Sequence, residues 1–396
     1  MICLGCSCLC DDLDFKNEDG KITVSNACLK GFKRIDSFNK NRLIPSINNE
    51  KKSIDDVINK TIEILNNSKK SAIFGLESSV IEAQNESIKL GEKIGSIIDN
   101  FSSVHGGYLI EKFLDGSVKT CALDDVRDNC DLSIYWGCDP MSTHPRLMSK
   151  FSYYPRGKNR QRGWEEDRNT ISIDARKSLT ANITKKFIKL RPGSDFELFE
   201  AFKDVLSGKL PKIGDKRLLM DVGTSIKKAK YGVVFAGDGL DYSRERVNDF
   251  IDLINDIGFK LQPVMDSIGF SKLLFDRFGF INSINLEDKS HSEDNSIFNV
   301  LKSDDIENIL IVESDIASYL PYKIAKRLKD INSIYIGPHN NLTAYLSKIT
   351  IPSSIAGVES GGNVCRMDLK EEKAEKVIDS DFLPSYDILN KIREGL

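Results

Sequence analysis

The sequence predicts an α/β protein built on parallel sheets. Short apolar runs bounded by Gly, Asp or Pro recur along the chain, and most precede a helical pattern of about ten or more residues. This alternation of strand and helix is typical of βαβ units, which place parallel strands beneath covering helices. Because 396 residues exceed the size expected for one hydrophobic core, the fold should contain two or three lobes.

The predicted elements follow one another from residue 53 onward. Ser53 with Asp56 three residues later forms a capping pattern ahead of apolar residues at helical spacing, which predicts a helix. The apolar run 71–75 ends in Gly and predicts a buried strand, and an amphipathic helix is expected from about 78 to 94. Further strands are expected at 131–136, 170–174, 231–235, 308–312 and 333–336.

Composition excludes several classes of protein. The net charge is -3 with 29% charged residues, a balanced surface that gives no electrostatic case for nucleic-acid binding. No apolar run reaches the roughly 18 to 20 residues of a membrane helix. No apolar signal segment follows Met1, and the later cysteines are scattered singly, so we expect a cytoplasmic protein without disulfides.

A cysteine frame occupies the first 28 residues, with Cys3, Cys6, Cys10 and Cys28 in the spacing C-x2-C-x3-C-x17-C. Four thiolates that converge on one point can hold a [4Fe-4S] cluster, which is the favoured interpretation. Zinc is the alternative, although zinc sites usually have two C-x2-4-C pairs, and reduced thiols are the third possibility. Cys8 does not belong to the frame and should either point away from the cluster or compete as a ligand.

Polar residues follow several predicted strands. The strand at 131–136 is followed by Gly137, Cys138 and Asp139. The strand at 170–174 ends in Asp174 and is followed by Arg176, and the strand at 231–235 is followed by the segment 236–239 (AGDG). Ligands of open parallel sheets bind beyond the carboxyl ends of the strands, where Gly admits phosphate, Asp accepts from ribose or guanine, and Arg neutralises pyrophosphate. An Asp after a strand is also an ordinary helix cap. No dinucleotide fingerprint or P-loop occurs at a strand–helix turn, which disfavours simple NAD or P-loop chemistry.

Two further features have a functional and an ordinary interpretation. The loop 155–168 is strongly basic, and either binds an anionic ligand or an acidic partner or is simply solvated. Its cations include Arg156, Lys158, Arg160 and Arg162. His105 stands in a turn of small residues (102–107), as expected where a substrate or cofactor approaches the backbone, although a single His is usually structural.

Several motifs together resemble the family of the formylmethanofuran dehydrogenase B subunit, in the molybdopterin oxidoreductase superfamily. They are the cysteine frame with 26–31 (NACLKG), then 131–146 (DLSIYWGCDPMSTHPR) and 174–178 (DARKS). Further matching stretches are 190–195, 357–367 and 377–382, so the resemblance spans nearly the whole chain. The cysteine frame is shared with many relatives, but YWGCDPMSTHPR combined with the C-terminal block is specific.

The resemblance implies both chemistry and partners. The family holds a [4Fe-4S] cluster on its N-terminal cysteines and molybdenum or tungsten on two molybdopterin guanine dinucleotides, and it interconverts carbon dioxide and formate. A separate amidohydrolase-like subunit couples formate to methanofuran, so that subunit, other subunits of the complex and ferredoxin-type electron carriers are the expected partners. The residues implied near the dinucleotides are Gly137, Cys138, Asp139, Asp174, Arg176, Gly193, Asp195 and Glu359.

The resemblance also implies a domain arrangement. We expect an iron–sulfur segment at 1–50, a first α/β lobe at 51–130 plus 266–396, and an inserted dinucleotide-binding lobe at 131–265. The pterin site would lie between the two lobes.

One departure from the family concerns the active-site turn. The family's turn resembles DNTASVCHG, in which Cys ligates the metal and the following His assists catalysis, but residues 99–106 read DNFSSVHG and contain no Cys. Residues 261–269 likewise lack the family's Arg and His. A lost selenocysteine, a metal held by pterin sulfurs and water alone, or a degenerate paralogue that acts as a structural or electron-relay subunit would each explain the turn. In an active enzyme, His105 would be the proton-transfer group.

Overall fold

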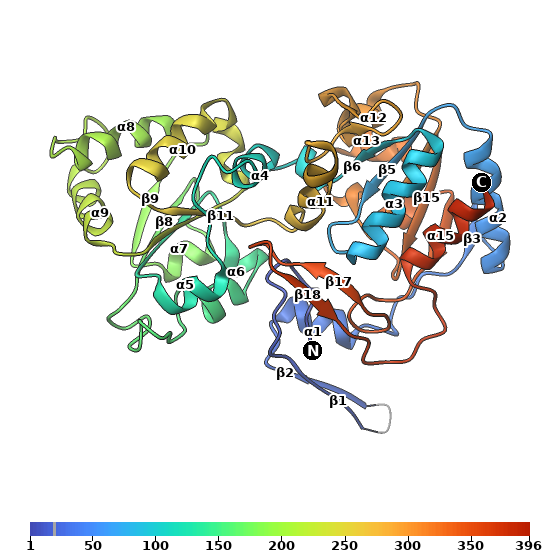
Figure 1. Ribbon diagram of the computed structural model, residues 1–396, viewed down its shortest axis with the longest axis horizontal. Helices are drawn as coiled ribbons and strands as arrows, with labels where there is room; N and C mark the ends of the chain where they lie inside the picture. Colours follow the sequence, from blue (N-terminus) through green and yellow to red (C-terminus); the bar gives the residue numbers. More distant parts are fainter. Residues whose placement is uncertain (19–20) are drawn as a thin grey trace. The chain divides into compact units, whose positions relative to one another are not determined.

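The computed structural model describes residues 1–18 and 21–396, which form two compact units (Figure 1). Unit 1 consists of Met1–Val104, Asp266–Arg366 and Glu371–Leu396, and unit 2 consists of His105–Met265 with Met367–Lys370. Residues 105–130 therefore belong to unit 2 rather than to the first lobe, because α4 (Gly107–Leu114) packs on β11 and α10 of unit 2. Residues 1–50 do not separate as a unit of their own.

Unit 1 is organised around a nine-stranded sheet in the order β13-β12-β6-β5-β14-β15-β16-β3-β4. Its five central strands run parallel and are buried along their length, apart from the first residue of β15. They are β6 (Ile97–Asp99), β5 (Ser71–Gly75), β14 (Asn308–Val312), β15 (Asn332–Gly337) and β16 (Ile349–Pro352). Short antiparallel strands extend both edges: β12 (Ile284–Asn285), β13 (Ser290–His291), β3 (Ser46–Ile47) and β4 (Glu50–Lys51).

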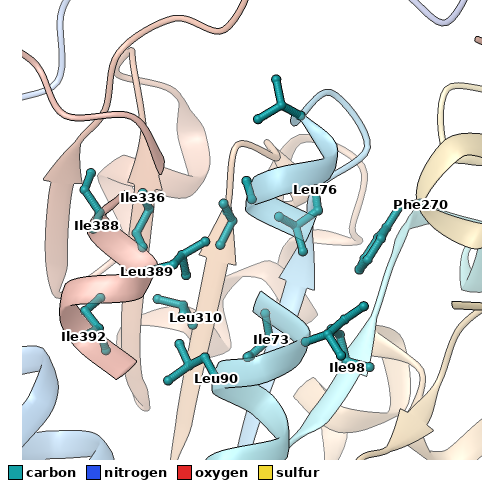
Figure 2. Close-up of a cluster of buried hydrophobic side chains, with 14 of the residues drawn as sticks. Ile73, Leu76, Leu90, Ile98, Phe270, Leu310, Ile336, Ile388, Leu389 and Ile392 are labelled. Carbon is teal, nitrogen blue, oxygen red and sulfur yellow. The ribbon is translucent and has the colours of Figure 1, made fainter. Parts of the chain in front are cut away.

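Helices cover both faces of the unit 1 sheet. The predicted helix α2 (Ile54–Asn66) begins with the expected capping box between Ser53 and Asp56. On one face of the sheet, α2 shares a hydrophobic core with α3 (Ile81–Ile94) and α15 (Ser385–Gly395). On the other face, a second core includes α12 (Ile297–Lys302) and α13 (Tyr322–Ala325). Figure 2 shows part of the first core, with side chains of Ile73, Leu90, Leu310, Ile336, Ile388, Leu389 and Ile392.

The N-terminal segment adds a hairpin and a helix to unit 1. Strands β1 (Asp14–Glu18) and β2 (Lys21–Ser25) pair antiparallel, and α1 (Leu29–Asp36) follows. A second hairpin, β17 (Gly362–Cys365) with β18 (Glu371–Ala374), packs near α11 (Ile268–Phe278) and α3.

Unit 2 contains a five-stranded parallel sheet in the order β11-β10-β7-β8-β9. The strands are β11 (Lys260–Pro263), β10 (Gly232–Ala236), β7 (Leu132–Trp136), β8 (Asn169–Asp174) and β9 (Lys186–Lys189). Trp136 packs against the rings of Phe199 and Phe250 at centroid distances of 5.3 and 5.2 Å. The surrounding helices are α5 (Leu123–Asn129), α7 (Leu179–Ile183), α8 (Asp195–Leu206), α9 (Lys216–Lys228) and α10 (Val247–Asp256).

The predicted α/β class with parallel sheets is confirmed, and each strand expected from an apolar run is present within one residue at either end. The sequence did not indicate β6, β9, β11 or β16, which are only three or four residues long. No helix in the described part of the chain is long and apolar enough to cross a membrane.

Candidate functional site

The two units repeat one module. In unit 2 the parallel neighbours β7, β8 and β9 contain five, six and four residues, and in unit 1 β14, β15 and β16 have the same lengths. A five-residue helix follows the second strand in each copy, α7 in unit 2 and α14 (Leu342–Leu346) in unit 1. The loops that follow the first and second strands of this module therefore lie at matching positions in the two units, at the carboxyl ends of the strands.

A clasp of four hydrogen bonds organises these loops in unit 2. Asp139, three residues after β7, accepts through Oδ1 from the N–H of Thr180 at 3.0 Å and from its Oγ1 at 2.6 Å. Ser142 Oγ donates to Asp139 Oδ2 at 2.7 Å, and the N–H of Met141 donates to Thr180 Oγ1 at 3.1 Å. Burial alone would raise the pKa of Asp139, but the bonds from Thr180 and Ser142 hold it below its ordinary value.

The same clasp occurs in unit 1 at the same spacing. Asp315 lies three residues after β14 and accepts from the N–H and Oγ1 of Thr343 at 2.9 and 2.8 Å. Ser318 Oγ donates to Asp315 at 2.5 Å, and the N–H of Ala317 donates to Thr343 Oγ1 at 3.0 Å. Sequence reasoning singled out Asp139 but missed this second copy, for which the repeated D-x-x-S after an apolar strand was the available signal.

Beyond the clasp, unit 2 has a groove of about 400 Å³ at the carboxyl ends of β7, β8, β9 and β10. Four of the predicted residues line it, Gly137, Asp174, Arg176 and Asp195, together with Arg191, Gly239 and Tyr242. A Cβ on Gly137, whose φ is +60°, would lie 2.9 Å from the Cα of Gly239, so the two loops approach closely only because both residues are glycine. The volume is in the range of ligand sites, and two arginines supply positive charge.

Three other predicted residues support the groove from beneath or beside it. Asp139 is held in the clasp, and the Cys138 thiol is buried and donates to the carbonyl of Phe235 at 3.3 Å. Burial raises the pKa of Cys138 well above its ordinary value, so this thiol stays protonated. Gly193 takes a left-handed φ of +79° in the loop before α8.

Asp195 is fixed at the inner wall of the groove. Its Oδ1 accepts from Trp136 Nε1 at 2.7 Å, and its Oδ2 accepts from Ser243 Oγ at 2.6 Å. Asp195 is only 4% exposed. The two hydrogen bonds that it accepts therefore fix the orientation of its carboxylate without a bound ligand.

Glu359 belongs to unit 1 and is engaged within it. Its carboxylate accepts from Arg42 at 2.9 Å, from the N–H of Ile355 at 2.8 Å and from Ser380 Oγ at 3.0 Å. The side chain is 5% exposed. Glu359 therefore does not line the groove, which is built from residues of unit 2.

Three of the four predicted cluster cysteines, Cys3, Cys6 and Cys10, lie in a closed loop of unit 1, and Cys28 lies outside this loop but near Cys3. The N–H of Cys3 donates to the carbonyl of Cys10 at 2.9 Å, and the N–H of Gly5 donates to Cys3 Sγ at 3.4 Å. A Cβ on Gly31 would stand 2.8 Å from Cys3 Sγ, so the glycine makes room for the sulfur. Burial raises the pKa of Cys3, and the thiols of Cys6 and Cys28 are near enough to raise it further.

Cys8 lies inside the same loop with none of its surface exposed. A hydrogen bond with Cys6, together with burial, raises the pKa of Cys8 well above its ordinary value. Among residues 1–18 and 21–396, no three or more His, Cys, Asp or Glu side chains are placed to hold a single metal ion. The donor set of four thiols with a backbone N–H directed at sulfur is the kind that iron–sulfur clusters use, and it fits such a cluster chemically.

His105 forms a pair with Asp241, a residue that sequence reasoning did not select. Nδ1 of His105 lies 3.3 Å from Asp241 Oδ2, and the N–H of Gly106 donates to Asp241 Oδ1 at 3.0 Å. The hydrogen bond to Asp241 raises the pKa of His105, and the charge of Asp238 adds to the effect. Side-chain exposures of 39% for His105 and 25% for Asp241 leave the pair within reach of solvent, as an acid–base group requires.

Replacing Asp241 with Asn should lower the pKa of His105 toward its ordinary value, since the neutral amide no longer stabilises the imidazolium. The raised pKa means that the pair stabilises the fold below pH of about 6.5 and that this contribution disappears as pH rises through the pKa of His105. NMR titration of the His105 ring measures the change. Asp252→Asn, an exposed change on α10, is the matched control, and identical titration curves for the two variants would contradict the pairing.

A buried polar network in unit 1 fixes the turn that precedes His105. Asn100 accepts through Oδ1 from the N–H of Ser102 at 2.8 Å and donates to the carbonyl of Ile281 at 2.8 Å. Asn282 donates to Ser102 Oγ at 2.7 Å, and Glu77 accepts from the N–H of Phe101 at 3.0 Å. Burial raises the pKa of Glu77 to about 7 in spite of these donors. The backbone of this turn, which contains no Cys, is thus held rigidly.

The basic loop 155–168 is largely paired within unit 2, which favours the ordinary interpretation of its charge. Arg160 lies 3.3 Å from Asp131, Lys158 lies 3.5 Å from Asp128, and Arg162 pairs with Glu166. Arg168 is 1% exposed and donates to carbonyls at the end of α5, including that of Cys130 at 3.0 Å. Its role is to cap that helix.

Two curated relatives align along nearly the whole chain. The B subunit of tungsten-containing formylmethanofuran dehydrogenase 2 from Methanocaldococcus jannaschii is 28% identical over 429 aligned positions, which cover 100% of this chain and 98% of the relative. The protein of the same name from Methanococcus maripaludis is 26% identical over 405 positions, covering 96% of this chain and 93% of the relative. No known family profile matches the chain.

Two solved structures share the fold. One chain of the formyltransferase/hydrolase complex (FhcABCD) from Methylorubrum extorquens, in complex with methylofuran, has a TM-score of 0.69 at 15% identity and covers 88% of this chain and 98% of its own. Acetylene hydratase from Pelobacter acetylenicus has a TM-score of 0.74 at 12% identity, covering 100% of this chain and 68% of its own. At these identities the likeness concerns the fold alone. Along its whole length, as its motifs predicted, this chain is related to the B subunit of formylmethanofuran dehydrogenase.

Proposed function

We propose that this chain is the B subunit of a formylmethanofuran dehydrogenase-type complex, in which carbon dioxide and formate are interconverted at a molybdenum or tungsten pterin site. The similarity to two tungsten-containing relatives supports this proposal. The observation that carries it is the repeated module, because a cofactor with two dinucleotide arms needs two equivalent sets of strand-end loops.

The unit 2 groove is assigned to the guanine nucleotide end of one dinucleotide. Arg176 and Arg191 would neutralise its pyrophosphate, since guanidinium forks match phosphate oxygens. The loops at Gly137 and Gly239 would let backbone approach the ligand, and the Asp195 carboxylate, already oriented, is suited to accept from guanine or ribose.

Guanosine diphosphate tests this assignment in the full chain. The double variant Arg176→Ala and Arg191→Ala should bind the nucleotide at least roughly a hundredfold more weakly, because two lost charge-assisted contacts at about 1.5 to 3 kcal/mol each remove at least about 3 kcal/mol of binding free energy. Isothermal titration calorimetry gives the dissociation constants. The matched control removes two cations elsewhere in unit 2, Arg156→Ala and Arg162→Ala, and equal weakening in both variants would point to general charge rather than to the groove.

The cysteine loop is assigned to a [4Fe-4S] cluster held by Cys3, Cys6, Cys10 and Cys28. When bound, such a cluster passes single electrons. The chain's own contribution is to exclude water and to direct the N–H of Gly5 at the sulfur of Cys3, which stabilises a thiolate. Zinc with no brown chromophore in the purified chain would contradict this assignment.

The turn at His105 carries the proton chemistry of the proposal. The pair with Asp241 holds the imidazole by Nδ1, and an imidazole held in this way can exchange a proton with a substrate or solvent through Nε2. The turn does not fit a thiolate-ligated metal, since Val104 precedes His105 and an apolar side chain cannot act as a ligand.

That misfit favours a second candidate function, a catalytically degenerate subunit that serves as a structural or electron-relay component. Metal analysis of the chain purified anaerobically with its native complex separates the two. The cluster assignment requires about four iron atoms per chain. This iron content together with molybdenum or tungsten supports a catalytic subunit. The same iron content without either metal supports the relay function.

A further inference from the structure

Three of the most exposed aromatic side chains lie together on unit 1. Tyr319, Tyr322 and Tyr345 are 63%, 78% and 68% exposed, and Leu342, one helical turn before Tyr345, is 45% exposed. They are carried by short helices after β14 and β15: η5 (Ile316–Ser318), α13, and α14. Single exposed apolar residues need no explanation, but a group of them does.

The carrying elements form one surface. η5 packs against α13 and α14, and η6 (Lys326–Lys329), which continues α13, packs against α14. The Tyr319 ring meets Phe101 edge-on at 4.7 Å, and Lys329 Nζ lies 5.0 Å from the centre of the Tyr345 ring. Figure 1 labels α13 in the orange part of the chain, beside α12. Two of the three rings are thus held by neighbours and would lose little freedom on binding a partner.

The same surface is positively charged. Lys323, Lys326 and Lys329 are exposed at intervals of three residues along the continuous helical stretch 322–329. None of these lysines forms an ion pair within the described residues. The neighbouring Asp304 and Asp330 pair instead with Arg327, and Asp315 is used in the clasp. We call the six residues the tyrosine–lysine patch: Tyr319, Tyr322, Lys323, Lys326, Lys329 and Tyr345.

We propose that the tyrosine–lysine patch docks an acidic surface of a partner protein. Tyrosine is enriched at the centre of protein interfaces because its large rigid ring is apolar and its hydroxyl can still hydrogen-bond. Unpaired lysines around such rings favour carboxylates, which steer association and fix the register of the partner. This inference rests on the proposed function only in placing the chain within a multi-subunit complex.

Carbodiimide cross-linking of the native assembly tests the proposal, because the reagent joins Lys to Asp or Glu only at ion-pair distance. The tagged full chain is purified with its partners, cross-linked and read by mass spectrometry. Lys323, Lys326 and Lys329 should be joined to carboxylates of a different polypeptide. The triple variant Lys323→Glu, Lys326→Glu and Lys329→Glu should reduce recovery of that polypeptide at least tenfold and lower the mass of the assembly.

The control reverses three exposed lysines elsewhere on unit 1, Lys51→Glu, Lys69→Glu and Lys391→Glu, and should leave the assembly unchanged. Links confined to this chain, links between two copies of it, or a loss of mass on nuclease treatment would each overturn the proposal. Iron content is measured in parallel. An assembly that cross-links through the patch but contains no iron contradicts the cluster assignment and leaves the docking inference standing.

Discussion

Replacing Cys28 with Ser should abolish the visible absorption of the anaerobically reconstituted chain and reduce its bound iron on the order of tenfold. Loss of an outer-sphere partner alone lowers metal affinity by about tenfold or more, so loss of a ligand should have at least this effect. Cys28 is the one frame cysteine outside the 3–10 loop, and it stands at the N-cap of α1. The N–H of Phe32 donates to its carbonyl at 2.8 Å, so the helix fixes where its side chain projects.

Cys121→Ser is the control for this experiment, because Cys121 is a buried thiol of unit 2 that lies outside the frame. The visible absorption and iron content of the Cys121→Ser variant should equal those of the unaltered chain. Cys8→Ser adds a second comparison: Cys8 lies against Cys6, and a loss of iron in this variant would make it a ligand. A spectrum unchanged by Cys28→Ser would remove Cys28 from the ligand set.

Replacing Asp99 with Ala should lower the free energy of unfolding by about 3 to 5 kcal/mol, which is at the upper end for single substitutions. Asp99 is 2% exposed and accepts from Ser103 Oγ at 2.7 Å. It also accepts from the N–H of Ser283 at 3.0 Å and the N–H of Ile297 at 2.6 Å. Its removal leaves two buried N–H groups unsatisfied, at about 1 to 3 kcal/mol each. It also frees the start of α12 and the turn that leads to His105.

Denaturant unfolding measures this loss, with Asp288→Ala as the control. Asp288 also accepts from a nearby N–H and hydroxyl, both of Ser290, but it is exposed, so water replaces its contacts and the change should stay within about 0.5 kcal/mol. Equal losses in the two variants would show that the buried network does not fix the turn.

Features encoded by neighbouring residues were predictable from the sequence. The capping box at Ser53 and Asp56 lies within one helical turn, and each predicted strand is a single apolar run bounded by turn residues. The motif around Gly137 and Asp139 marked a strand end as a site, and the unit 2 groove brings Gly137 together with Asp174, Arg176 and Asp195. Such patterns can be read locally because the periodicity of apolar residues that marks a helix or strand lies within consecutive residues.

The tertiary structure decided which distant residues meet. Asp139 meets Thr180 across 41 positions and Asp315 meets Thr343 across 28, while His105 meets Asp241 across 136 and Arg42 meets Glu359 across 317. The residues that flank an Asp or His in the sequence do not identify its distant partner, because the pairing depends on the order of the strands in a sheet. The sequence by itself determined the α/β class, the cysteine frame and the relationship to a family. Only the fold turned single polar residues into two matching clasps, a groove and a hydrogen-bonded His–Asp pair.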